Sequence, residues 1–153
     1  MKSMSIPEVR KSAEETFSSG LNCAESTALA TATSQGIETE LLPRMATVFG
    51  GGMARSCGQC GALTGAMMGI SLALGRSAAG ESVEAAYAAT QRLVHEFEDV
   101  FGSRNCQALL GGIDLGTPEG QATFKKQELR GRCLQFTGTA AAIAARILVE
   151  HTG

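Results

Sequence analysis

The sequence predicts an all-α protein, a single-domain multi-helix bundle that spans residues 1–153. Apolar residues recur at helical spacing in several segments, whereas no stretch shows the sustained alternation of a half-buried strand. Capping signals separate these segments from one another. The chain has no linker, repeat or low-complexity tract, and 153 residues are enough for one ordinary domain to bury a core.

The first predicted helix opens with a capping box. Ser5 can cap it, Pro7 suits its first turn, and Glu8 stands three residues after the cap, where its carboxylate can return a hydrogen bond. Gly20 is expected to end this helix, because glycine adopts the left-handed conformation of a helix C-terminus at little cost.

The second and third predicted helices follow directly. Asn22 caps the second helix, Glu25 completes its capping box, and Ala-rich sequence carries it to about Gln35. A third helix is expected over residues 38–49, where it meets the glycines 50–52.

The fourth helix is predicted to begin near Cys60 and to end at Gly75. Gly61, Gly65 and Gly69 recur at four-residue spacing and form one smooth face. Each glycine costs a helix about 1 kcal/mol relative to alanine, so close packing or a ligand should offset it. This face and the Ala-rich last helix suggest a homodimer interface.

The fifth helix has the clearest amphipathic pattern. Arg92, Glu96 and Asp99 lie off its apolar stripe, and Gly102 terminates it. The predicted stripe consists of Val83, Ala86, Tyr87, Leu93, Val94, Phe97, Val100 and Phe101.

Three shorter signals complete the predicted bundle. Asn105 caps a short helix that closes at glycines 111–112, and Thr117 precedes a proline that starts the next segment. That segment carries the basic and polar residues 125–132, and a final Ala-rich helix is expected over about 133–149.

Composition and charge exclude several partner classes. The net charge is −2 and no basic run exceeds Lys125-Lys126, so a nucleic-acid-binding face is not expected. Residues 1–10 are polar and lack a secretory signal. The apolar run 62–74 is short and interrupted, which is typical of a core helix and not of a membrane span. We therefore expect a soluble cytoplasmic protein.

The five cysteines are the main candidates for chemistry, because the chain has no Trp, one Tyr and two His. Stable structural disulfides are rare in a reducing cytosol, where grouped cysteines are more often metal-binding or redox-active. The two histidines, His95 and His151, are interpreted as surface residues. The alternative is that all five cysteines are small buried hydrophobes.

Three cysteines fall at predicted helix starts. Cys23 follows the cap Asn22, Cys106 follows the cap Asn105, and Cys60 follows a glycine-rich turn. Unpaired backbone N–H groups and the helix dipole favour a thiolate there, and a thiolate is both a nucleophile and a ligand of soft metals. An arginine also stands near a cysteine three times: Arg55 near Cys57, Arg104 near Cys106 and Arg132 near Cys133.

The segment Cys57-Gly58-Gln59-Cys60 has the spacing of a redox disulfide or of half a zinc site. The βαβ context of thioredoxins is absent, and glycine instead of histidine follows Cys60, which excludes a covalent c-type haem. Cys57 lies in the loop and is a resolving thiol, an extra ligand or an incidental residue. Gly58, Gly61 and Gly65 are candidate cofactor-contacting residues around Cys60.

Cys60-Gly61-Ala62-Leu63-Thr64-Gly65 matches a Cys-Gly-Ala-x-x-Gly motif. With one upstream and two downstream cysteines, the chain resembles the C_GCAxxG_C_C family of redox-active proteins. The resemblance implies a four-cysteine centre made of Cys23, Cys60, Cys106 and Cys133, with Cys57 as an addition. The sequence is also similar to the N-terminal part of split-Soret-type cytochromes, which implies an iron–sulfur centre but no haem site.

These observations predict a redox-active protein that uses the four-cysteine centre for thiol–disulfide chemistry. If it is an enzyme, the expected class is a thiol-dependent oxidoreductase, and its redox partner is not identified by the sequence. Thiol–disulfide exchange is preferred because Cys57 offers a resolving partner to Cys60. The alternatives are that Cys23, Cys60, Cys106 and Cys133 bind an iron–sulfur cluster or a structural zinc ion.

Overall fold

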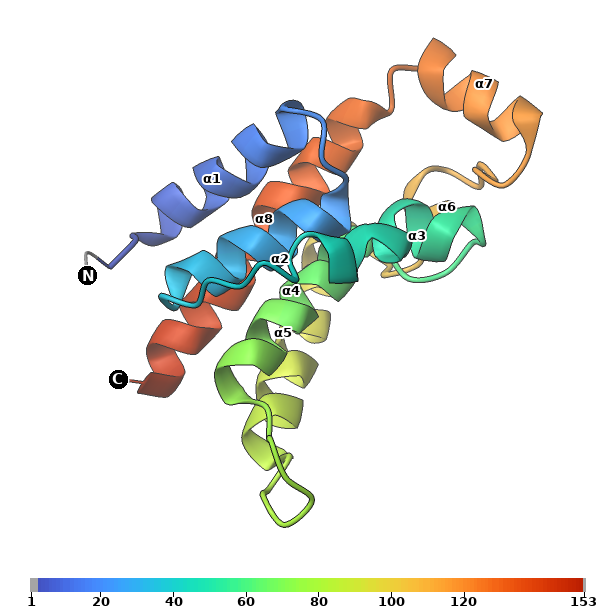
Figure 1. Cartoon of the computed structure of the whole chain (residues 1–153). Coiled ribbons are helices and arrows are strands. Elements are labelled where there is room, and N and C mark those ends of the chain that lie inside the picture. Colours follow the sequence, from blue (N-terminus) through green and yellow to red (C-terminus); the bar gives the residue numbers. More distant parts are fainter. Residues whose placement is uncertain (1–2, 153) are drawn as a thin grey trace.

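The computed structural model describes residues 3–152 and forms a helical bundle (Figure 1). Within the described residues there is no strand; Gln59 and Asn105 form an isolated bridge. The all-α prediction is confirmed. The helices of these residues are α1 (Ile6–Ser18), α2 (Cys23–Ser34), the 3-10 helix η1 (Arg44–Phe49), α3 (Gly50–Arg55), α4 (Gly61–Leu74), α5 (Glu84–Phe101), α6 (Cys106–Leu109), α7 (Pro118–Lys126) and α8 (Arg130–Thr152).

Helix α8 is the centre of the bundle and packs against α1, α2, α4 and α5. Small side chains along it, Ala140, Ala141, Ala144 and Ala145, are fully or almost fully buried, which lets neighbouring helices approach closely. Among the described residues, α8 is the one helix whose length and apolar composition would suffice to cross a membrane. Inside this protein, 61% of its apolar window is buried.

The glycine face of α4 packs against α2. A Cβ atom added to Gly65 would collide with the Ala24 carbonyl oxygen and the Thr27 hydroxyl, and one added to Gly69 would collide with the Thr31 side chain. The predicted close approach of another helix is therefore confirmed. Because this face is covered within the chain, it does not support the predicted homodimer.

Both predicted capping boxes are present. The Ser5 hydroxyl accepts from the Glu8 N–H and the Glu8 carboxylate accepts from the Ser5 N–H. Asn22 and Glu25 exchange the same pair of bonds at 2.9 and 2.8 Å. The second oxygen of the largely buried Glu25 accepts from the Thr47 hydroxyl at 2.8 Å. The start of α2 is thereby tied to η1.

The expected helix over residues 38–49 is wrong. The chain forms turns up to Pro43, which caps the 3-10 helix η1. An α-helix across the whole segment would place Pro43 in its interior, where the ring lacks an N–H and clashes with the preceding turn. Likewise, α8 begins at Arg130 and not near Cys133, so Cys133 lies within its first turn.

The apolar stripe of α5 is narrower than predicted. Its buried residues are Ala86, Ala89, Leu93 and Phe97, whereas Tyr87 and Val100 are 60% and 61% exposed. Positions at the edge of a helical stripe become buried only where a neighbouring element covers them, and helical spacing alone does not show which edge is covered.

An aromatic cluster joins α5 to α8. The ring centroids of Phe97 and Phe101 lie 4.9 Å apart, and Phe101 meets Phe136 edge-on at 4.9 Å. Pairs of this kind contribute about 0.5–1.5 kcal/mol beyond their buried area. Because Phe136 also lines a cavity that contains four of the cysteines, the cluster fixes one wall of that cavity.

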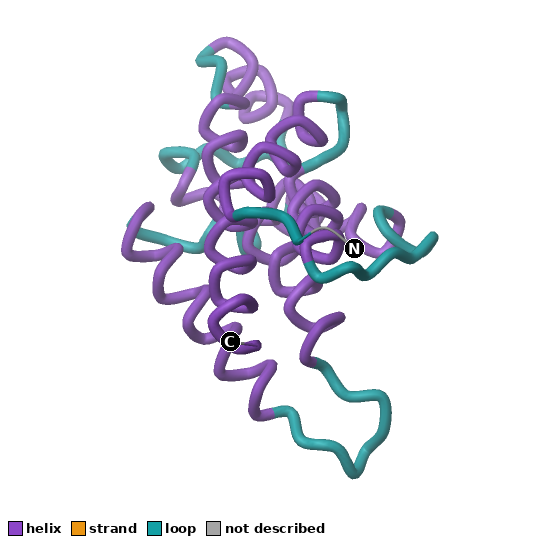
Figure 2. Tube along the Cα trace, turned by 90° about the vertical axis from the view of Figure 1, so that its left-hand side faces the viewer, coloured by secondary structure: helices purple, strands orange, loops and turns teal. Residues whose placement is uncertain are grey.

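The two ends of the bundle differ in character. The loop at residues 75–83, between α4 and α5, lies at one end in both views (Figures 1 and 2). At the other end of α4, the short elements α3 and α6 gather, and α7 projects away from the packed helices (Figure 1). The cysteines lie at this second end.

Candidate functional site

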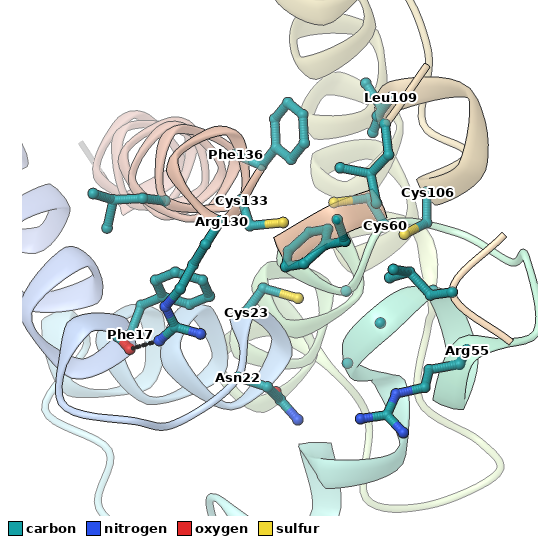
Figure 3. Close-up of a pocket in the computed structure, with 18 of the residues that line it drawn as sticks. Phe17, Asn22, Cys23, Arg55, Cys60, Cys106, Leu109, Arg130, Cys133 and Phe136 are labelled. Carbon is teal, nitrogen blue, oxygen red and sulfur yellow. Dashed lines mark hydrogen bonds between the residues drawn. The ribbon is translucent and has the colours of Figure 1, made fainter. Parts of the chain in front are cut away.

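Four of the five cysteines line one cavity of about 1020 Å³. Cys23 is the first residue of α2, Cys60 is the N-cap of α4, Cys106 is the first residue of α6, and Cys133 lies in the first turn of α8. Their sulfur atoms point toward a common space (Figure 3). All are free thiols. The structure thus gathers residues that are up to 110 positions apart (Cys23 to Cys133) around one space.

Two backbone hydrogen bonds hold the Cys60 and Cys106 segments together. The Cys60 N–H donates to the Arg104 carbonyl at 2.8 Å, and the Cys106 N–H donates to the Gly58 carbonyl at 2.9 Å. The two loops therefore run antiparallel for one short step. This pairing brings the starts of α4 and α6 to the same side of the cavity.

Helix α3 is a left-handed turn. Residues 51–55 all have φ between 56° and 71°. The conformation costs roughly 1–2 kcal/mol for each residue that is not glycine, here Met53, Ala54 and Arg55. The turn is closed by the Gly52 carbonyl, which accepts from the Gly58 N–H at 2.9 Å. The glycine run thus starts a strained turn that the surrounding contacts must hold.

Two glycines bring backbone directly against cavity thiols. A Cβ atom on Gly52 would lie 2.5 Å from Cβ of Cys106 and 3.0 Å from its Sγ. A Cβ atom on Gly61 would lie 2.7 Å from Sγ of Cys23. Sequence reasoning selected Gly61 but missed Gly52, for which the triple glycine was the available signal.

The other two glycines proposed for cofactor contacts lie elsewhere. A Cβ atom on Gly58 would meet Cγ of Met53 at 2.5 Å, so Gly58 packs beneath the left-handed turn. Gly65 faces Ala24 in the interface between α2 and α4. Neither glycine lines the cavity. Both glycines lie near Cys60 in the sequence, but the contacts that they permit are packing contacts within the protein.

Burial raises the pKa of each cavity thiol above its ordinary value of 9.0. The pKa of Cys106 rises to about 11 and that of Cys133 to about 12, with desolvation as the largest cause and negative charge on Cys23 as the next. The pKa of Cys60, which is 4% exposed, lies well above 9.0. The thiols are therefore protonated at neutral pH.

Backbone N–H groups act in the opposite direction. The Ala62 N–H lowers the pKa of both Cys23 and Cys60, the Gly51 N–H lowers that of Cys23, and the Leu63 N–H lowers that of Cys60. This is the effect expected at a helix start. Desolvation outweighs it, so the expectation of lowered thiol pKa values was wrong in its net sign.

The cation beside Cys133 is Arg130 and not Arg132, the arginine selected from the sequence. The charge of Arg130 lowers the pKa of Cys133, although burial and the neighbouring thiols, which raise this pKa, have larger effects. The guanidinium group lies 4.2 Å from the centroid of the Phe17 ring and donates to the Phe17 carbonyl at 2.8 Å. Arg130 is thereby fixed at the edge of the cavity (Figure 3).

Cys57 does not line the cavity. Its thiol faces the Asp114 carboxylate, whose hydrogen bond is the largest cause of its raised pKa. Its carbonyl accepts from the Asn105 side-chain amide at 2.8 Å. The thiols whose charges act on Cys60 are Cys23 and Cys106, so the structure does not support Cys57 as the resolving partner of Cys60.

The thiols do not form a compact ligand set for one metal ion. In residues 3–152, no group of three or more His, Cys, Asp or Glu side chains is close enough to hold an ion. His95 and His151 are both exposed, as predicted. The arrangement instead presents four separate thiols to a shared space that small molecules can enter.

The remaining cavity wall was not predicted from the sequence. It contains three cations, Arg55, Lys125 and Arg130, and one carboxylate, Glu128. Its apolar part includes Phe17, Leu109, Leu110, Leu115, Phe124 and Phe136. Several of these residues belong to or flank α7, whose position away from the bundle leaves the space open.

Comparison with known proteins identifies the family of the chain. A family model described as "Putative redox-active protein (C_GCAxxG_C_C)" matches residues 21–147, a range that contains all four cavity cysteines. No curated protein and no solved structure matches the chain. The family match covers most of the sequence, and the chain therefore belongs to the C_GCAxxG_C_C family of redox-active proteins.

Proposed function

We propose that this protein carries out thiol–disulfide exchange, with Cys23 and Cys60 as the reacting pair. One contact supports this pair above the others: Sγ of Cys23 lies against Gly61, the residue after Cys60, only 2.7 Å from where a Cβ atom on Gly61 would stand. The Ala62 N–H also faces both thiols. Cys23 is the more exposed of the two, and Cys60 lies deeper. This is the arrangement of an attacking thiol backed by a resolving thiol.

The reaction balances with an external disulfide as oxidant. The Cys23 thiolate attacks one sulfur of the external disulfide and displaces the first thiolate. The Cys60 thiolate then attacks the Cys23 sulfur of the mixed disulfide and displaces the second. One S–S bond is broken and one is formed, two electrons pass to the external disulfide, and the two cysteine protons end on its two thiol products. The N–H groups of Gly51 and Ala62 stabilise the developing negative charge on sulfur.

An iron–sulfur cluster is the second candidate. Four thiols line one cavity, and backbone N–H groups are directed at two of them. An all-thiol donor set suits such a cluster, which would supply one-electron transfer. Cys23, Cys60, Cys106 and Cys133 would hold it.

A structural zinc ion has less support than either redox proposal. Zinc binds thiolates at about 2.3 Å, so its ligands must lie nearly in contact with one another. The described residues contain no ligand group that is this compact.

One experiment separates these functions. We would purify the protein without oxygen, measure iron, acid-labile sulfide and zinc, and then titrate it with hydroxyethyl disulfide. Disulfides would be located by peptide mass mapping. We expect colourless protein with five free thiols, of which two disappear and reappear as a Cys23–Cys60 disulfide. Cys60→Ser should accumulate the mixed disulfide on Cys23, and Cys57→Ser should behave like the parent protein.

Three outcomes would overturn the proposal. Brown protein with iron and sulfide would favour the cluster. One zinc per chain without thiol loss would favour a structural metal in a binding module. Thiols that resist the disulfide would make this a helical interaction domain.

We further propose that the protein acts in the cytoplasm, where reducing conditions return the pair to the dithiol form.

A further inference from the structure

The cavity is much larger than the two reacting thiols require. Its volume of about 1020 Å³ lies at the upper end of the range for small-molecule sites, roughly 300–1,000 Å³. It extends from the cysteines to α7, which forms its outer wall with Gln121 and Phe124. A site of this size beside reactive groups is suited to hold the substrate itself.

We propose that this cavity binds a small anionic disulfide, and its thiol product, as the exchange partner of Cys23 and Cys60. The inference rests on the proposed function and names the substrate class. Three further features of the site support it: the depth of the resolving thiol, the charge of the cavity wall and the apolar part of that wall.

The depth of the reacting pair favours a small substrate. Cys60 is 4% exposed and lies on the inner wall of the cavity. A small molecule reaches such a recessed thiol more readily than a disulfide that is held in the surface of a folded protein. A molecule of a few hundred daltons fits inside it and can bring its sulfur atoms to Cys23.

The charge of the wall favours an anion. Three cations face one carboxylate, Glu128, around the cavity. The Arg130 guanidinium is held in place by Phe17 through a 2.8 Å hydrogen bond and a ring contact, so it needs little ordering when a ligand arrives. In residues 3–152 the ion pairs join other residues, which leaves Arg55 and Lys125 available for a ligand. Arg55 and Arg130 both belong to the wall of the cavity that contains the Cys23 thiol (Figure 3).

The apolar part of the cavity wall suits the uncharged middle part of such a ligand. Leu109, Leu115, Phe124 and Phe136 line the cavity with apolar side chains, and the backbone of the three glycines 50–52 lines it as well. A ligand with terminal carboxylates and an uncharged middle around its S–S bond matches this division. The carboxylates would pair with the arginines while the disulfide lies against the thiols.

The test compares small disulfides of different charge. Oxidised glutathione is the anionic probe, hydroxyethyl disulfide the neutral one and cystamine the cationic one. Each rate of thiol loss is divided by the rate with free dithiothreitol, which removes intrinsic reactivity. We expect the corrected rate for oxidised glutathione to exceed that for hydroxyethyl disulfide by about tenfold at low salt, and cystamine to be slowest. The preference should shrink at 0.5 M salt.

Variants assign the preference to the cavity. The double variant Arg55→Gln, Lys125→Gln should bring the ratio of the oxidised glutathione and hydroxyethyl disulfide rates close to one. Arg132→Gln is the matched control, because Arg132 is an exposed cation near the start of α8 that does not line the cavity. Equal corrected rates for the three probes would overturn the inference. It would also be overturned if the control variant lost the preference for oxidised glutathione to the same extent as the double variant.

A redox-inert probe separates this inference from the proposed function. S-methylglutathione carries the same carboxylates but cannot exchange, and its binding is measured by calorimetry. Binding that the double variant loses, without any thiol exchange, would refute the function and keep the anion site. Exchange without binding or charge preference would keep the function and refute the site.

Discussion

At the scale of single residues, neighbours decide what each cysteine can do. Cys57 and Cys60 stand three positions apart, yet one faces the Asp114 carboxylate and the other lies on the cavity wall. A carboxylate that accepts the S–H hydrogen bond keeps Cys57 protonated, and burial does the same for Cys60. The two thiols of the Cys-x-x-Cys spacing thus resist ionisation for different reasons.

Removal of the Asp114 charge should activate Cys57. Asp114→Asn keeps an oxygen that can accept from the Gly116 N–H, now bonded at 2.8 Å, but removes the negative charge beside the thiol. The pKa of Cys57 should fall, so iodoacetamide should label Cys57 several-fold faster at pH 8, as followed by peptide mass spectrometry. Asp99→Asn, on the exposed side of α5, is the control. An unchanged labelling rate would show that Asp114 does not hold the thiol.

At the scale of elements, the tight contact between α2 and α4 positions Cys23 and Cys60, the proposed reacting pair. Cys23 starts one of these helices and Cys60 caps the other. Because the α4 glycines let the two helices touch, the starts of both helices share one wall of the cavity. Glycines that weaken α4 by itself are therefore offset by the packing they permit.

Two glycine substitutions should have opposite effects on stability. Gly65→Ala would drive a methyl group into the Ala24 carbonyl, so we expect unfolding free energy to fall by about 1–3 kcal/mol. Gly131→Ala lies in α8 with open space around the new methyl group, and should raise it by about 0.5–1 kcal/mol. Denaturant unfolding measures both. A Gly65→Ala protein as stable as the parent would contradict the tight α2–α4 contact.

At the scale of the whole molecule, the four cavity cysteines join otherwise separate parts. Cys133 lies in the central helix α8, and Cys106 begins the short helix α6 that precedes the loop to α7. Both line the same cavity. A disulfide between Cys23 and Cys60 would enclose α2, η1 and the left-handed turn α3 in a covalent loop. The proposed disulfide would thereby link the redox state of this pair to the stability of the bundle.

Oxidation should raise the melting temperature. Closing a loop of this length stabilises a protein by roughly 2–4 kcal/mol, mainly through the unfolded state. For a chain of this size each kcal/mol shifts the melting temperature by about 2–4 °C. We therefore expect the oxidised protein to melt roughly 5–15 °C above the reduced protein in calorimetry. Cys60→Ser should show no such increase, and an equal increase in that variant would assign the stabilisation to another pair.

The sequence by itself determined the all-α class and most helix starts. The capping boxes at Ser5 and Asn22 and the caps at Asn105 and Thr117 were readable because each depends on residues three positions apart. The helix expected over residues 38–49 was wrong because the local cost of Pro43 outweighed the helical pattern. The predicted helix starts also placed Cys23, Cys60 and Cys106 correctly at the beginnings of helices, because each of these cysteines directly follows a capping residue or a turn in the chain.

Only the tertiary structure decided which cysteines meet and in what surroundings. Convergence of the thiols depends on contacts between segments far apart in sequence, such as the pairing of the Cys60 and Cys106 loops. Their pKa values follow from desolvation, which is set by everything packed around them and not by the helix start alone. The cationic cavity wall likewise combines Arg55 of α3, Lys125 of α7 and Arg130 of α8, a convergence that no local pattern encodes.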